Sequence, residues 1–259
     1  PHPSASMRWT FTVSTVAGAS IDTSHEARRG YENFTGEGDD RLLGVTGRLR
    51  RDEDNRADSS SAYAQGEIEL SPRWAATLGV RSGRVEFRSD DHYITEGNPD
   101  DSGSLAYHYT NPVAALQFRA SPQLNVYVSA GRGFETPTFG ELAYRPDGQP
   151  GFNSELKAQT SRQVEIGAKW RSTDLGIALD AALFQARTDD EIGVATNSGG
   201  RSTFRNVGRT QRQGVELDLR WRRRQNFYEV KNEPRPKVRI ATFCTFGGDD
   251  YKILSLEAR

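Results

Sequence analysis

The sequence contains a single cysteine, Cys244, and only four histidines in 259 residues. One cysteine cannot form an intrachain disulfide or build a cysteine-based zinc site, and no two histidines have the spacing of a helical metal-ligand pair. Lysine and arginine number 34 against 35 aspartate and glutamate residues, so no net charge favours nucleic acid. The composition therefore predicts no metal, no cofactor and no nucleic-acid partner.

Long hydrophobic runs are also missing. No apolar stretch approaches the roughly 18 residues with which a helix crosses a bilayer, which excludes a helical membrane protein. A transmembrane β-barrel is not excluded, because each of its strands needs only about 9–11 alternating residues. No Ser/His/Asp arrangement, Gly-x-Ser-x-Gly motif or metal triad is present, so the sequence predicts that the protein is not an enzyme.

What the sequence does contain is alternation with a period of two. In GVELDLRW, residues 214–221, apolar side chains occupy one face and charged side chains the other. This period is typical of a strand between two unlike surroundings. Eight such segments predict eight strands, at about residues 8–19, 60–70, 75–88, 105–120, 125–133, 159–171, 176–187 and 211–221.

The connections between these segments are alternately short and long. Tight turns are predicted at 71–73, 121–123 and 172–174, whereas long connectors rich in glycine, proline, asparagine and aspartate are predicted at 22–59, 89–104, 134–158 and 188–210. Trp74, Trp170 and Trp221 lie at or beside the short-turn ends, where an aromatic girdle meets lipid headgroups. A soluble antiparallel sheet explains one alternating strand equally well, but the eight segments and the loop asymmetry together favour a barrel wall.

Four segments in order resemble TonB-dependent outer-membrane receptors. They are SAYAQGEIELSPRWAATLGVR (61–81), LNVYVSAGRGFETPTFGEL (124–142) with its Gly-Phe-x-x-Pro motif, LKAQTSRQVEIGAKW (156–170), and FRNVGRTQRQGVELDLRW (204–221). The resemblance covers roughly residues 8–221. It implies structural roles for the hallmark residues Gly133, Phe134, Pro137, Glu165, Gly167, Asn206, Gly208, Gly214 and Glu216.

The resemblance also implies a fold, a location and a function. The expected fold class is all-β: about eight antiparallel strands of a larger plugged transmembrane barrel, with short turns on one side and long loops on the other. Its expected location is the outer membrane of a Gram-negative bacterium, in contact with outer-membrane lipid. The expected function is uptake of a scarce ligand, such as a ferric siderophore, with TonB acting only through a plug domain.

Candidate ligand-binding residues lie in the predicted outer loops. Arginine beside aromatic rings suits an anionic, planar chelate through charge-assisted hydrogen bonds and cation–π contact. A solvated loop or a structural role is the alternative reading of each side chain. The candidates are Tyr31, His92, Tyr93, Tyr144, Arg145 and Phe152.

The sequence departs from the family pattern in two respects. It contains no plug domain and no TonB box, and after Trp221 the alternation fails and the composition changes. We therefore expect two parts: residues 1–221 as a partial receptor barrel, and residues 222–259 as an atypical tail. A frameshift, a gene fusion or an interrupted gene explains such a tail, and a genuine divergent C-terminus is the alternative. A truncated, non-functional remnant and a soluble β-rich binding protein stay open as alternatives. Partition separates them, because a barrel segment should sediment with outer membranes and these two should not.

Overall fold

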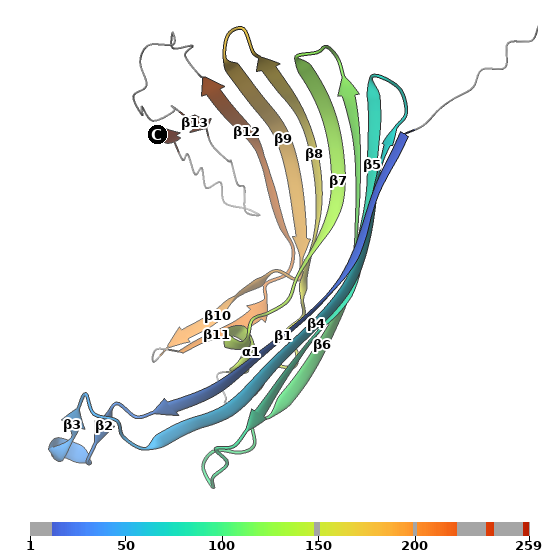
Figure 1. The fold of residues 1–259 in the computed structure, drawn as a ribbon. Coiled ribbons are helices and arrows are strands. Elements are labelled where there is room, and N and C mark those ends of the chain that lie inside the picture. The colour runs from blue at the N-terminus through green and yellow to red at the C-terminus, as the bar shows by residue number, and fades with distance from the viewer. Residues whose placement is uncertain (1–11, 148–150, 199–200, 222–236, 241–255, 259) are drawn as a thin grey trace, which may run out of the picture.

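The computed structural model describes residues 12–147, 151–198, 201–221, 237–240 and 256–258. Its main feature is one strongly curved antiparallel sheet, in which consecutive long strands lie side by side (Figure 1). The eight long strands are β1 (Thr12–Tyr31), β4 (Leu49–Glu69), β5 (Trp74–Asp91), β6 (Gly103–Arg119), β7 (Leu124–Glu135), β8 (Gln159–Ser172), β9 (Ile177–Asp189) and β12 (Thr210–Trp221). The predicted all-β wall with antiparallel neighbours is confirmed.

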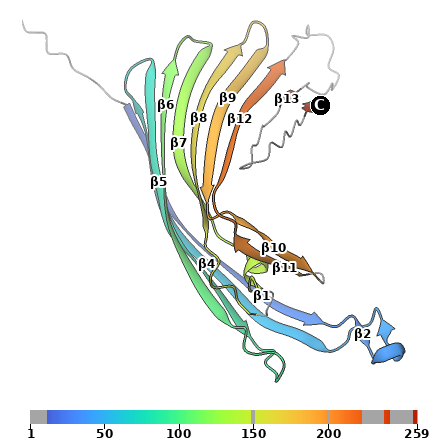
Figure 2. The ribbon, with the colours of Figure 1, turned by 180° about the vertical axis from the view of Figure 1, so that it is seen from behind.

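Smaller elements occupy the connections and the concave side of the sheet. The short helix α1 (Phe139–Leu142) and the hairpin of β10 (Ile192–Ser198) and β11 (Arg201–Asn206) lie inside the curve in both views (Figures 1 and 2). The pair β2 (Phe34–Thr35) and β3 (Leu42–Leu43) flanks a 3-10 turn, η1 (Gly38–Asp40), at the far end of β1. Among the residues that the structure describes, no helix is long and apolar enough to cross a membrane.

All three predicted tight turns are present at one end of the sheet (Figure 1). The Ser71 hydroxyl accepts hydrogen bonds from the backbone N–H groups of Arg73 and Trp74, at 3.3 and 3.1 Å. Ser121 closes the next turn in the same way. The third turn is completed by Gly176, whose φ of 64° lies in the left-handed region that glycine adopts freely. The serine side chains therefore replace the hydrogen bonds that strand pairing no longer supplies at these ends.

The strand register collects the apolar side chains on the convex face. One row of directly opposed residues crosses all eight strands: Val13, Ile68, Ala76, Leu116, Val128, Ile166, Leu183 and Val215. These side chains are not covered by protein: Ile166 is 52% exposed and Leu183 is 55% exposed. Trp74 packs on Phe118 near the short turns, with ring centroids 4.7 Å apart. A continuous exposed apolar band with aromatic residues at its edge is typical of a barrel wall.

The predicted connector at 22–59 is wrong over most of its length. β1 continues to Tyr31 and β4 begins at Leu49, so only residues 32–48 connect them. These extensions lie beyond the apolar band, where both faces meet water, and their sequence has no apolar alternation. Cross-strand polar contacts hold them instead, such as Arg29 with Asp52 at 3.1 Å and Thr23 with Asp58 at 2.8 Å.

The other long connectors also contain regular structure that alternation did not predict. Residues 134–158 include α1, and residues 188–210 include the β10–β11 hairpin. Most of the expected tail, residues 222–259, lies outside the described residues. Its two described pieces, β13 (Lys237–Ile240) and β14 (Leu256–Ala258), add to the sheet beside β12.

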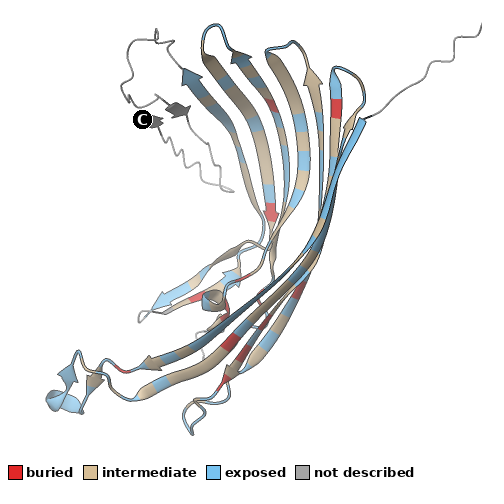
Figure 3. Cartoon of the chain, in the orientation of Figure 1, coloured by how far each residue is buried: buried red, intermediate tan, exposed pale blue. Residues whose placement is uncertain are grey.

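A small core fixes the inner loop to the wall. Leu142 of α1 is fully buried and packs with Leu156 against Phe87 and Tyr107, which point from β5 and β6 into the concave side. Figure 3 shows that buried residues are few along the wall and gather on the strands around α1. The Tyr107 hydroxyl donates to the Leu156 carbonyl at 2.6 Å. This cluster therefore holds the segment that follows α1 at a defined place near the outer end of the sheet.

Candidate ligand site at the outer end of the wall

A cavity of about 460 Å³ lies at the long-loop end of the sheet. It is formed where the ends of β1 and β4 meet the loop between β5 and β6 and the segment after α1. Three of the six candidate ligand residues, Tyr31, Tyr93 and Tyr144, come together here from separate parts of the chain. The complete lining is Arg28, Arg29, Gly30, Tyr31, Arg50, Arg51, Glu53, Asp91, Tyr93, Gly97, Asn98, Asp101 and Tyr144.

Arg51 fixes Tyr144 in the cavity. Its Nη2 donates to the Tyr144 hydroxyl at 2.5 Å, and its guanidinium carbon lies 5.1 Å from the centre of the tyrosine ring. The Nε of Arg51 is 3.0 Å from Glu53 Oε1, which holds the guanidinium in turn. Because Tyr144 follows α1 by two residues, the buried Leu142 and the Arg51 contact together determine where its ring lies.

A second carboxylate, Glu32, binds two arginines at the start of β4. Glu32 accepts from Arg48 Nε at 3.1 Å and from Arg50 Nη1 at 3.0 Å, and its side chain is only 6% exposed. The hydrogen bonds from Arg48 and Arg50 hold the pKa of Glu32 below its ordinary value. In the described part of the chain Arg28 forms no ion pair, because Glu53, directly opposite it on β4, is held by Arg51, so the Arg28 guanidinium keeps its donors for a ligand.

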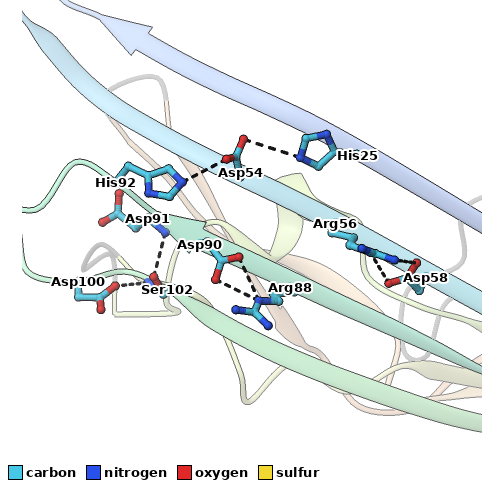
Figure 4. Close-up of polar contacts among 10 residues, drawn as sticks. All are labelled: His25, Asp54, Arg56, Asp58, Arg88, Asp90, Asp91, His92, Asp100 and Ser102. Carbon is cyan, nitrogen blue, oxygen red and sulfur yellow. Dashed lines mark hydrogen bonds and ion pairs between the residues drawn. The ribbon is translucent and has the colours of Figure 1, made fainter.

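The acidic side of the cavity orders the loop that carries Tyr93. The Asp91 carboxylate accepts from the backbone N–H groups of Tyr93 and Asp101, at 2.9 and 3.2 Å. Figure 4 shows the neighbouring closure, in which Ser102 Oγ accepts from the Asp91 N–H at 2.9 Å. Burial raises the pKa of Asp101 above its ordinary value, and the nearby carboxylates of Asp91 and Glu53 raise it further.

The cavity combines the groups that an anionic, aromatic ligand requires. Four guanidinium groups and three phenol rings line it beside three carboxylates. An arginine already held by one carboxylate keeps further N–H donors on its other edges. The arrangement can therefore offer charge-assisted hydrogen bonds and ring faces together.

The other three candidate residues lie outside this cavity, and their ligand roles stay predictions. His92 Nε2 is 3.2 Å from Asp54 Oδ2, and His25 approaches the same carboxylate at 3.8 Å (Figure 4). Arg145 is exposed and pairs with Asp147 at 3.6 Å. Phe152 packs against the small core and closely covers Gly103. No cluster of three His, Cys, Asp or Glu side chains within the described ranges is arranged to hold a metal ion.

Two hallmark residues shape the concave face at mid-wall. Glu165 accepts a hydrogen bond from the Tyr127 hydroxyl at 2.6 Å. A Cβ at Gly167 would lie 2.6 Å from the Tyr127 ring, so only glycine leaves room for the ring in this position. Gly214 and Glu216 lie on the same face of β12, with Gly214 directly opposite Phe184.

The remaining hallmarks fix the loops. Phe134 stacks on Tyr109 with ring centroids 4.7 Å apart, and Pro137 is fully buried. Gly133 leaves space for the hydroxyl of Ser161 opposite it. The Asn206 side chain accepts from the Lys157 N–H through Oδ1 and donates to the Lys157 carbonyl through Nδ2. The same Nδ2 also donates to the Asp190 carbonyl at 2.7 Å. Gly208 follows with a φ of 101°.

Sequence reasoning missed the arginine-rich half of the cavity. Arg28, Arg29, Arg50 and Arg51 fall inside the stretch that was expected to be a connector. The available signal was the pair of basic clusters ARRGY (27–31) and RLRR (48–51), which antiparallel pairing of β1 with β4 brings together. Without the strand extensions, nothing placed these clusters beside Tyr93 and Tyr144.

Comparison with known proteins gives one consistent result. Residues 3–247 match the family model described as TonB dependent receptor-like, beta-barrel. The chain is 24% identical over 188 residues to the probable TonB-dependent siderophore receptor PiuA of Acinetobacter baumannii, across 66% of this chain and 22% of that protein. It is 29% identical over 120 residues to the vitamin B12 transporter BtuB of Vibrio vulnificus, across 46% of this chain and 18% of that protein. The chain thus spans about a fifth of the length of these relatives.

Solved structures show the same fold. The siderophore receptor PiuA from Acinetobacter baumannii superposes with a TM-score of 0.66 at 17% identity, covering 93% of this chain and 38% of that one. The ferric yersiniabactin uptake receptor FyuA from Yersinia pestis gives a TM-score of 0.63 at 18% identity, covering 92% of this chain and 33% of that one. In both, the curved sheet corresponds to part of a larger barrel wall.

Proposed function

This chain belongs to the TonB-dependent receptor β-barrel family, and we propose that it supplies part of the wall and an outer-loop ligand site of an outer-membrane receptor for a ferric siderophore or a similar anionic chelate. The family is one of receptors and transporters of the outer membrane. The chemistry of the cavity and the siderophore receptors among the relatives support this ligand class.

The observation that carries the proposal is the cavity itself. Three tyrosines and four arginines converge at the end of the wall opposite the short turns, where long loops are expected to face the outside. A ferric chelate built from deprotonated aromatic ligands is large, planar in parts and negatively charged. Ring faces and guanidinium donors match both properties, whereas a neutral ligand would leave the four guanidinium groups with only three carboxylates.

The capture step follows from these contacts. The ligand would enter from the loop side and take hydrogen bonds from Arg28 and from the free edges of the other arginines. Tyr144 and Tyr93 are already held, by Arg51 and by the Asp91-closed loop, so little side-chain freedom is lost when the ligand binds. Passage further inward would require movement of a plug domain by TonB, and the lumen face with Glu165 and Tyr127 is where a plug would lie.

Binding of a ferric tris-catecholate complex tests the ligand class. We expect Arg28→Gln to weaken binding, measured by quenching of intrinsic fluorescence, by about 10- to 100-fold, the range for one charge-assisted hydrogen bond. Arg73→Gln removes an exposed arginine in a short turn at the opposite end of the wall and should change affinity by less than about twofold.

Two results would contradict the proposal. Equal loss in both variants would mean that the complex responds only to overall charge. Binding of a cobalamin but not of the ferric catecholate would leave a receptor with a different ligand.

A further inference from the structure

Three arginines lie in one row across three strands on the convex face of the wall. Arg132, Arg162 and Arg187 are directly opposed across β7, β8 and β9. All three are exposed. Like charges in directly opposed positions of a sheet destabilise it. Three arginines in one row therefore need an anion to offset their repulsion.

The sheet does not supply that anion. Elsewhere on the convex face arginines pair with carboxylates two residues along the same strand: Arg84 with Glu86 at 2.6 Å, Arg56 with Asp58 at 2.7 Å and Arg88 with Asp90 at 3.0 Å (Figure 4 shows the last two). None of the three arginines in the row forms an ion pair within the described ranges.

The neighbours of the row do not replace the missing anion. Arg187 donates only to the neutral amide of Gln211, at 3.1 Å. Asp189, two positions along β9 from Arg187, is bound by Arg209 at 2.7 Å, and Arg162 acts on it only at longer range. The three guanidinium groups consequently keep most of their donors available.

The position of the arginine row relative to the apolar band indicates which anion could bind there. Directly below the arginine row, toward the short turns, lies the outward row of Ala130, Val164 and the uncharged Gln185, followed by the apolar row of Val128, Ile166 and Leu183. The arginines are therefore the first charged residues above the apolar band, at the level of lipid headgroups. Arginine binds phosphate bidentately and is well suited to a headgroup site.

A shallow apolar depression of about 270 Å³ lies further down the same strands. At its centre Ala168 is directly opposite Ala181, between bulkier rows. Arg162 and Ala168 are six residues apart, about 20 Å along the strand at 3.3 Å per residue. With a strand tilt near 45° this is about 14 Å of depth, close to the roughly 15 Å of one leaflet. An acyl chain whose phosphate is held by the arginines would reach this depression.

We infer that the convex face of β7, β8 and β9 is a binding site for a phosphate-bearing lipid of the outer leaflet. Arg162 and Arg187, with Arg132 beside them, hold the phosphate, and the depression at Ala168 and Ala181 receives the end of an acyl chain. This inference rests on the proposed function, because it needs the wall to stand in an outer membrane. The site is separate from the ligand cavity, since none of its residues lines that cavity.

The test is native mass spectrometry of the full chain, extracted from membranes in mild detergent and titrated with diphosphorylated lipid A, the same lipid without its phosphates, and inorganic phosphate. We expect the double variant Arg162→Gln/Arg187→Gln to bind the phosphorylated lipid about tenfold or more weakly than the unaltered chain. Arg84→Gln, which removes an outward arginine that already has a carboxylate partner, should bind it normally.

Several results would overturn the site. One is that the lipid without phosphates binds as tightly as the phosphorylated lipid. Another is that Arg84→Gln loses as much lipid affinity as the double variant. A third is that inorganic phosphate at matched concentration displaces the lipid, which would make the anion a free phosphate. Ferric catecholate binding is measured on the same preparations and should not change in the double variant. If the unaltered chain binds the phosphorylated lipid selectively but does not bind the ferric catecholate, only the proposed ligand is refuted. Failure of the lipid site and failure of the proposed ligand are therefore distinguishable.

Discussion

Leu142→Ala is the substitution that most directly tests how the fold positions the ligand cavity. Leu142 is the one apolar side chain of α1 that is fully buried, and it anchors the inner loop to Phe87 and Tyr107. Tyr144, two residues later, lines the cavity and touches Arg51. If this chain of contacts is correct, a cavity created at Leu142 loosens the loop and, through it, the ligand site.

The expected magnitude follows from burial. Replacing a fully buried leucine by alanine costs about 2–5 kcal/mol, because transfer free energy is lost and a cavity remains. Besides Leu142, the short α1 is held by its capping box, in which Thr138 and Glu141 bond reciprocally, and by Phe139, whose ring packs edge-on against Phe87. We therefore assign the cost to local opening of the loop. At about 3 kcal/mol, the open population rises about a hundredfold.

Hydrogen exchange is the appropriate measurement, since it reports local opening. The amide of Asn153 donates to the Leu142 carbonyl at 2.8 Å, and the amide of Leu142 donates to Thr138 at 3.1 Å. Both amides should exchange about a hundredfold faster in the variant, and affinity for the ferric chelate should fall. Leu183→Ala, at a half-exposed leucine on the convex face, is the matched control and should change neither. Unchanged exchange at Asn153, or an equal increase throughout β8 and β9, would refute the reasoning.

Three further predictions follow from other contacts. Gly167→Ala places a methyl group 2.6 Å from the Tyr127 ring and should cost about 1–3 kcal/mol in urea unfolding, whereas Gly131→Ala, whose nearest neighbour is at 3.6 Å, should be tolerated. Asn206→Ala removes three hydrogen bonds, worth roughly 1 kcal/mol each, and should expose the loop to limited proteolysis, with an unchanged cleavage pattern as the contrary result. The folded-state pKa of Asp101 is raised, so its contribution to stability is fully present below the unfolded pKa and is lost as the pH rises through the folded pKa. Anion binding to the cavity should likewise tighten as the pH falls through that window. Asp101→Asn should abolish this part of the pH profile.

The wall was predictable from sequence only where its two faces meet different surroundings. Between Ala62 and Leu70 the convex positions of β4 must be apolar and the concave positions polar, so the period of two is visible. Beyond that band, from Leu49 to about Ser59, both faces meet water and no rule of alternation applies. Cross-strand pairs such as Arg29 with Asp52 stabilise the strands there, and these pairs are recognisable only when the register is known.

The candidate site was predictable only in part for the same reason. Tyr31, Tyr93 and Tyr144 were chosen as loop aromatics, and the fold brings them into one cavity. Phe152 has the same chemistry, but it packs against the core instead, because the loop turns inward after α1. The contact between Arg51 and Tyr144 joins residues 93 positions apart. No local pattern of either segment specifies the other.

Charge pairing separates two uses of the same residue type on the convex face. Arg56 and Arg88 each have an aspartate two positions further along their own strand, so the sequence itself contains the compensating charge. Arg162 has no carboxylate at either position two residues away, and Asp189, two positions along β9 from the opposed Arg187, is bound by Arg209 instead. A wall selected for stability alone would have no reason to keep this row of like charges at the edge of its apolar band. The repulsion is offset if the phosphate of the surrounding lipid completes the site, so we expect the double glutamine variant to lose the lipid without losing stability in detergent.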